Sequence, residues 1–164
     1  MTFHPSENDL TSALDDVFYE IHQLVVTAVV STNKPELNNS FLESRLLHAR
    51  NLLCFFESEP RRADDVLATD YGFRAERLPI SDHYRRRLHK DLAHLTYSRA
   101  RRQEADRHWP LEEIVQPILN RSSNFVEHLL SERRDFGDRV RKHWETLLLA
   151  VAEALGEVER GTDA

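Results

Sequence analysis

Residues 7–30 read ENDLTSALDDVFYEIHQLVVTAVV, and their apolar side chains are spaced as on one face of a long helix. Steps of four and three residues separate Leu10, Leu14, Val17, Ile21, Leu24 and Ala28. Ser6 or Asn8 can cap the start, because a short polar side chain accepts a hydrogen bond from the first turn. The polar residues 31–35, which end in Pro35, are expected to stop it. The pattern therefore predicts a helix over about residues 7–30 with one buried face.

Further helices are expected along the rest of the chain. Similar apolar spacing predicts them at about 36–56, from Ser81 through Tyr84, Leu88 and Leu92 to Leu95, from Pro110 to Leu129, and at about 134–160. Pro117 should kink or divide the fourth of these helices. The last should bury Val140, Trp144, Leu147, Val151, Leu155 and Val158 and stop at Gly161. Between the helices, residues 64–68 could form one short turn with an aspartate cap, and residues 96–109 form a polar, arginine-rich connection.

Composition agrees with a helical fold. The chain has 164 residues, of which 40% are hydrophobic and 30% charged, with only 4 Gly and 6 Pro to make turns. Strand-like alternation is absent from the sequence. We therefore predict an all-α, up-and-down bundle of four to five helices. It forms one domain over residues 1–164, with its core at about residues 7–160.

The sequence also indicates where the protein resides. No stretch approaches the ~18 consecutive apolar residues of a membrane span, and the first residues lack the basic and apolar segments of a secretion signal. Cys54, the single cysteine, lies in the run LLCFF and is expected to be a small buried hydrophobe. We expect a soluble, cytoplasmic protein that does not associate with membranes.

Charge is unevenly distributed along the chain. The formal net charge is −6, yet residues 77–108 contain nine Lys or Arg against four acids, together with four histidines. A basic segment of this kind could attract a phosphate backbone or an acidic protein partner. It could equally be a solvated face that is neutralised by the acidic remainder. The cations expected to contact nucleic acid or a partner are Arg85, Arg86, Lys90, Arg101, Arg102 and His108.

Within this segment, residues 89–96, HKDLAHLT, carry the strongest indication of chemistry. On a helix, Arg87 and His94 are seven residues apart, close to two turns. A histidine that titrates near neutrality can move protons while arginines hold a phosphate. The alternative is that His94, between Ala93 and Leu95, is a buried histidine with one hydrogen bond to a neighbouring helix.

Metal chemistry has little support in the sequence. A four-helix carboxylate site needs Glu-x-x-His on paired helices, and Asp91-x-x-His94 is the nearest approach. Cys-x-x-Cys, His-Glu-x-x-His and a glycine-rich phosphate loop are all absent. We expect no metal ligands and no cofactor, and a metal-binding bundle is the least favoured of the hypotheses.

Three segments resemble a family of small bacterial helical proteins near the HEPN group, the helical domains of prokaryotic toxin and antiviral systems. They are residues 41–56 (FLES, LHARNL and FF), residues 64–67 (DDVL), and residues 89–99 (HKDLAHLT and Arg99). The resemblance implies a ribonuclease, often dimeric, with an arginine, a polar residue, four to six further residues and then a histidine. The matches to this spacing are Arg77 to His83, Arg87 to His94, Arg101 to His108, Arg102 to His108, and Arg121 to His128.

Two functional hypotheses remain open. The first is a metal-independent ribonuclease, or an RNA-binding component, of a bacterial toxin or defence system. His94 would then be the general acid or base, and Arg87, Arg50 and Arg99 would contact the scissile phosphate. The second is a non-catalytic helical module whose basic face docks an acidic partner or a second copy of the chain.

Overall fold

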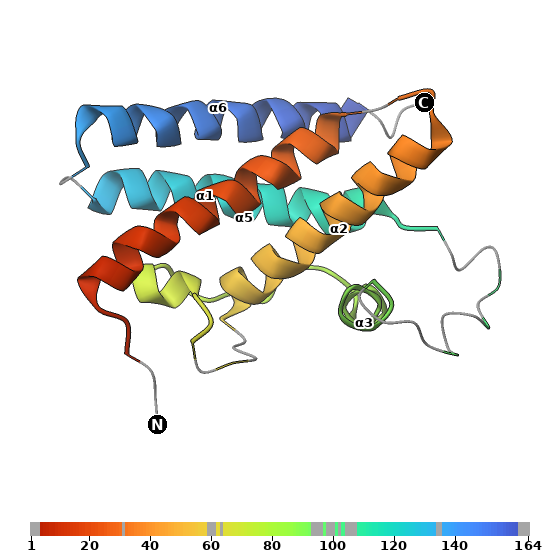
Figure 1. Ribbon diagram of the computed structural model, residues 1–164, viewed down its shortest axis with the longest axis horizontal. Helices are drawn as coiled ribbons and strands as arrows, with labels where there is room; N and C mark the ends of the chain where they lie inside the picture. The colour runs from red at the N-terminus through yellow and green to blue at the C-terminus, as the bar shows by residue number, and fades with distance from the viewer. Residues whose placement is uncertain are drawn as a thin grey trace.

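A computed structural model describes residues 4–30, 32–58, 62, 64–92, 97, 101, 103, 108–133 and 136–160. Within these residues the α-helices are α1 (Glu7–Val29), α2 (Pro35–Glu57), α3 (Asp82–Lys90), α5 (Leu111–Glu132) and α6 (Asp138–Arg160), and a short 3-10 helix, η1, spans Ala68–Tyr71. Helices α1 and α6 run in one direction and α2 and α5 in the other, and α3 is seen end-on beside α2 (Figure 1). The predicted all-α bundle is confirmed.

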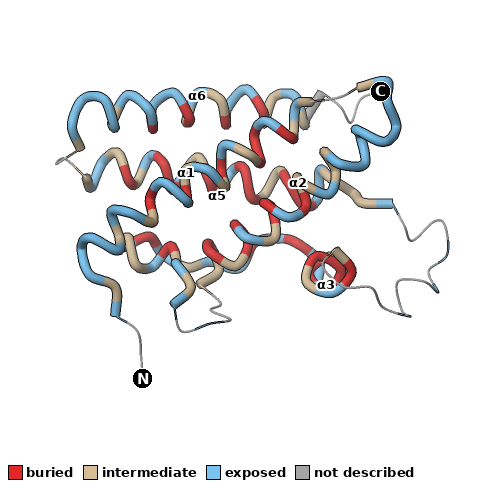
Figure 2. Tube along the Cα trace, in the orientation of Figure 1, coloured by how far each residue is buried: buried red, intermediate tan, exposed pale blue. Residues whose placement is uncertain are grey.

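The core lies between the four long helices. Helix α1 packs against α2, α5 and α6, and α5 packs against α2 and α6. Buried residues occupy the helix faces that turn inward (Figure 2), and the predicted stripe of α1 supplies Leu14, Val17, Ile21 and Leu24 to this core. The prediction for Val140 is wrong: this side chain is 45% exposed, because α6 begins only at Asp138 and its first turn lies at the end of the bundle.

Capping explains where α1 and α3 begin. The Ser6 hydroxyl accepts a hydrogen bond from the Asp9 amide at 3.2 Å, and the Asp9 carboxylate accepts one from the Ser6 amide at 2.8 Å. The Ser6 hydroxyl also donates to the Asp9 carboxylate at 2.7 Å, and this bond together with the one from the Ser6 amide holds the pKa of Asp9 below its ordinary value. The Ser81 hydroxyl caps α3 as predicted, accepting from the Tyr84 amide at 3.4 Å.

Two local predictions for proline and the connecting segment need correction. Pro110 is the N-cap of α5 and not its first helical residue, and α5 continues through Pro117 without division. The short helix of this region is η1, which shares only Ala68 with the turn expected at residues 64–68; residues 65–67 are not helical. The reason is that the Asp70 carboxylate accepts a hydrogen bond from the Leu67 amide at 2.8 Å, which fixes the first turn there.

Two further predictions concern the chain ends and the membrane. Gly161, the expected stop of the last helix, lies outside the described residues, as do Leu95 and most of the connection at 96–109.

Among the helices that the structure describes, none has both the length and the apolar character needed to span a bilayer.

Candidate functional site

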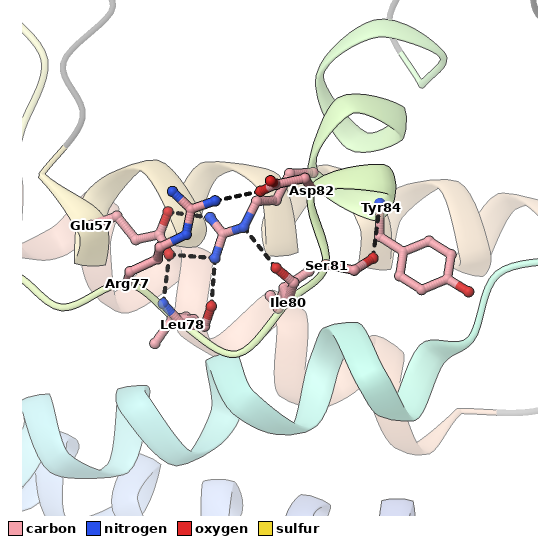
Figure 3. A network of polar contacts seen from close by, with 8 residues as sticks. Glu57, Arg77, Leu78, Ile80, Ser81, Asp82 and Tyr84 are labelled. Atoms are coloured by element: carbon pink, nitrogen blue, oxygen red, sulfur yellow. Dashed lines mark hydrogen bonds and ion pairs between the residues drawn. The ribbon is translucent and has the colours of Figure 1, made fainter.

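Arg85 is a structural residue of the α2–α3 junction. Its guanidinium forms an ion pair with Glu57, the last residue of α2, and donates from Nε to the Ile80 carbonyl at 2.8 Å (Figure 3). The same carboxylate accepts a hydrogen bond from the Leu78 amide at 2.6 Å, so one ion pair also fixes the segment before α3. Only 9% of Arg85 is exposed. Its assignment to the partner-binding face is therefore wrong, because its charge is buried and neutralised inside the protein.

Arg87 is likewise used to hold the fold. It is 3% exposed, and its Nη1 donates to the His108 carbonyl at 2.8 Å. The guanidinium carbon lies 3.9 Å from the centre of the Trp109 ring and 5.9 Å from that of Tyr84, which are cation–π distances. The prediction that Arg87 contacts a scissile phosphate is therefore wrong, since its charge is buried against aromatic rings that join α3 to the start of α5.

Other predicted cations do lie at the surface. Arg86 and Lys90, one turn apart on α3, are exposed, as are Arg101 and His108. These residues remain candidates for contact with a nucleic acid or an acidic partner. Three of the residues nominated from the sequence lie outside the described residues: His94, Arg99 and Arg102.

Arg50 lines a cleft between α1, α2 and residues 62–67, with a volume of about 390 Å³. Asn51 and Cys54 follow Arg50 on the same side of α2 and line the cleft as well. Cys54 is half-buried, so the expectation that it is a fully buried hydrophobe is corrected. The apolar run LLCFF contributes core residues on one side and a cleft wall on the other.

The structure brings Arg50 together with a histidine that the sequence did not nominate as its partner. Arg50 Nε donates to His89 Nδ1 at 3.4 Å, which joins α2 to α3. An arginine can only donate, so His89 Nδ1 is the acceptor and the proton of the neutral ring lies on Nε2. The arginine–histidine spacing search missed this pair because the two residues come from different helices.

A second polar group fixes a carboxylate at the cleft. His48 Nδ1 lies 2.8 Å from Glu20 Oε2, and Asn51 Nδ2 lies 3.2 Å from each Glu20 oxygen. His48 is buried, and its ring packs edge-on to Tyr19. Glu20 also lines the cleft, and its side chain is 25% exposed. These contacts orient a carboxylate before any ligand arrives.

One of the sequence matches to the arginine–histidine pattern has a structural role. The guanidinium carbon of Arg121 lies 4.1 Å from the centre of the Phe73 ring, and its Nη1 lies 3.1 Å from a Glu76 oxygen. His128 Nε2 lies 3.0 Å from the Tyr71 carbonyl oxygen and its ring also contacts Phe73. Both residues of this match thus anchor the segment after η1 to α5, and neither lines the cleft.

The described residues contain no group of three or more His, Cys, Asp or Glu side chains placed to hold a metal ion. Comparison of the chain with protein-family models, with curated proteins and with solved structures finds no significant match. The arrangement of residues around the cleft is therefore the basis for the functional argument.

Proposed function

We propose that this chain is a HEPN-like helical domain that binds RNA and cleaves it without a metal ion, as a component of a bacterial toxin or defence system. The observation that supports the proposal is the hydrogen bond between Arg50 and His89 at the edge of the cleft. A guanidinium and an imidazole in contact are the two groups that phosphodiester cleavage needs when no metal takes part. We expect the protein to act in the cytoplasm and as a homodimer.

The long Arg50–His89 bond suggests how RNA would engage the pair. A phosphate offers Arg50 a bidentate interaction with an opposite charge, which is stronger than its single 3.4 Å hydrogen bond to a neutral imidazole. Phosphate binding therefore draws Arg50 away from His89 Nδ1. His89 Nδ1 then accepts the proton of a ribose 2′-OH while that oxygen bonds to phosphorus, and the P–O5′ bond breaks with the leaving oxygen protonated by water. Arg50 meanwhile neutralises charge on the phosphoryl oxygens.

The exposed cations of α3 would supply the sequence-independent part of RNA affinity. Arg86 and Lys90 lie on the same helix as His89, so a strand held by these side chains passes near the reacting pair. Each phosphate contact also releases counterions, so RNA affinity should fall as salt rises. Arg86→Glu with Lys90→Glu should weaken RNA binding without changing which bonds are cut.

The test measures cleavage of single-stranded RNA in EDTA by the native chain, Arg50→Lys, His89→Gln and the control His83→Gln. His83 is an exposed histidine of the same helix and does not line the cleft. We expect His89→Gln and Arg50→Lys to lower the rate about 100-fold or more, the usual contribution of a general base or an oxyanion donor, and His83→Gln to leave it unchanged. Absence of metal-free cleavage by the native chain would refute the proposal.

A second candidate function is a non-catalytic module that docks an acidic protein partner. The observation that favours it is that Arg86, Lys90 and Arg101 are exposed, whereas Arg87 is withdrawn into the fold. In this case the charge reversal at Arg86 and Lys90 weakens a salt-dependent association, and His89→Gln has no effect on it. An association that resists both the reversal and high salt would exclude this candidate.

A further inference from the structure

The cleft beside Arg50 has walls that differ in chemistry from its rim. Apolar side chains form the walls: Ala13, Val17, Leu52, Phe55, Val66 and Leu67. Charged side chains stand at the rim: Asp16 and Glu20 lie one turn apart on α1, Arg50 lies on α2, and Arg62 and Asp65 lie on the segment after α2. An apolar cavity with a few oriented polar groups is the usual form of a small-molecule site, and about 390 Å³ falls within the usual range of volume.

We infer that this cleft binds one unstacked nucleobase of an RNA strand, and that it prefers a base with an exocyclic amino group. The inference rests on the proposed function, in which Arg50 contacts the phosphate of the same strand. Proteins read single-stranded RNA by taking splayed bases out of the stack and bonding their edges, so a cavity of this size next to a phosphate contact fits that mode of recognition.

The signs of the charges orient the nucleotide. Arg62 and Asp65 carry opposite charges and offset each other on the third side of the cleft, whereas Asp16 and Glu20 together repel a phosphate. The uncharged base therefore enters the cleft on the α1 side while the phosphate stays at Arg50. A ligand whose anionic group had to enter the cleft would meet these carboxylates. A neutral planar base meets the apolar walls instead and leaves its backbone outside.

The carboxylates also explain the preferred base. An ionised carboxylate only accepts hydrogen bonds and offers about four acceptor positions. His48 and Asn51 occupy three of these on Glu20 and fix its orientation, so a further donor can bind without reorganising the carboxylate. The exocyclic amino groups of adenine and cytosine are such donors. Uracil has no amino group, and its one donor at the pairing edge, N3–H, is flanked by two carbonyl oxygens that a carboxylate repels.

The experiment titrates adenosine, cytidine and uridine into isotopically labelled protein and follows backbone amide shifts by NMR. Nucleosides carry no phosphate, so they test the cleft without the Arg50 contact. We expect adenosine and cytidine to shift residues of the cleft and uridine to bind about tenfold more weakly. No shifts at the cleft, or equal affinity for the three nucleosides, would overturn the inference.

Val66→Trp fills the cleft, and its matched control is Val26→Trp. Both valines are exposed to a similar degree, 38% and 37%, but only Val66 lines the cleft. Val66→Trp should abolish adenosine binding, and Val26→Trp should preserve it. Glu20→Gln replaces the carboxylate that accepts from the amino group, and Asp15→Asn is its exposed control on the same helix. Glu20→Gln should weaken adenosine binding several-fold, and Asp15→Asn should leave it unchanged. Adenosine binding that survives Val66→Trp would place the base elsewhere.

The outcomes separate this inference from the proposed function. Adenosine binding at the cleft with no RNA cleavage in EDTA would remove the ribonuclease and keep the base site. Cleavage that depends on His89, with no nucleoside bound at the cleft, would keep the ribonuclease and remove the base site.

Discussion

Neutralising Glu57 should destabilise the protein more than any change at its surface. The Glu57 side chain is 4% exposed and that of Arg85 is 10% exposed, so Glu57→Gln leaves a buried guanidinium without its counter-charge. Removal of one partner of a buried ion pair costs about 3–5 kcal/mol. The Leu78 amide also exchanges a carboxylate acceptor for an amide oxygen, which accepts a weaker hydrogen bond.

The assay is urea denaturation followed by circular dichroism, together with a thermal melt. For a chain of this size about 1 kcal/mol corresponds to roughly 2–4 °C, so the melting temperature should fall by roughly 6–20 °C. The matched control is Arg77→Ala, which removes the neighbouring ion pair with Asp82, whose side chains are 63% and 68% exposed. That pair should contribute about 0–1 kcal/mol.

The double variant Glu57→Met with Arg85→Met completes the test. Because it removes both charges, it should be more stable than Glu57→Gln, although the Leu78 amide and the Ile80 carbonyl still lose their partners. If Glu57→Gln costs no more than Arg77→Ala, the buried pair does not anchor α3 and the reasoning fails.

Three further predictions concern local contacts. Tyr71→Phe should cost about 0.5–1.5 kcal/mol at pH 8, because the Tyr71 hydroxyl donates to the Leu10 carbonyl at 3.0 Å. Burial raises the pKa of Tyr71 to about 12. The stability that the Tyr71 hydroxyl contributes is therefore complete below pH 10 and is lost as the pH rises through 12. If urea melts show that Tyr71→Phe costs the same free energy of unfolding at pH 8 and at pH 12, this account is wrong. Arg87→Lys should lower the free energy of unfolding by about 1–2 kcal/mol in urea denaturation, because an ammonium cannot reproduce the planar stack on Trp109. The control Arg86→Lys changes an exposed residue and should leave stability unchanged. Equal effects of the two substitutions would count against the stack. Asp9→Asn should lower the melting temperature at pH 7. Because the pKa of Asp9 lies below its ordinary value of 3.8, the difference from the native chain should disappear only once the pH has fallen below that lowered pKa. A difference that persists at pH 2 would show that the carboxylate charge is not responsible.

The bundle could be predicted because the residues that define each helix and its buried face lie close together in the sequence. Residues Leu14, Val17 and Ile21 are spaced to share one helix face, and a long amphipathic helix has few other ways to bury that face. Ser6 and Ser81 mark helix starts for the same reason, since a cap depends on residues within one turn. The spacing of apolar residues and the helix caps were therefore enough to predict the helices and the fold class.

The candidate site depends on partners far along the chain, which periodicity does not show. Arg85 is indistinguishable in sequence from exposed Arg86, and only Glu57, 28 residues away, makes its burial possible. Arg50 and His89 are separated by 39 residues, so a search at fixed spacing could not join them. The family resemblance placed Arg50 and the segment beginning at His89 in one proposed site, but it did not show which atoms meet.

The contact of Arg87 with His108 and Trp109 has a consequence for how this chain can change. It ties the second half of α3 to the residues just before α5, so the two described ends of the intervening chain are held close together. Doubling the length of a closed loop adds only about 0.6 kcal/mol of closure entropy. A change in the number of residues between Leu92 and His108 would therefore cost the bundle little, and α3, the Arg50–His89 contact and the cleft would keep their places.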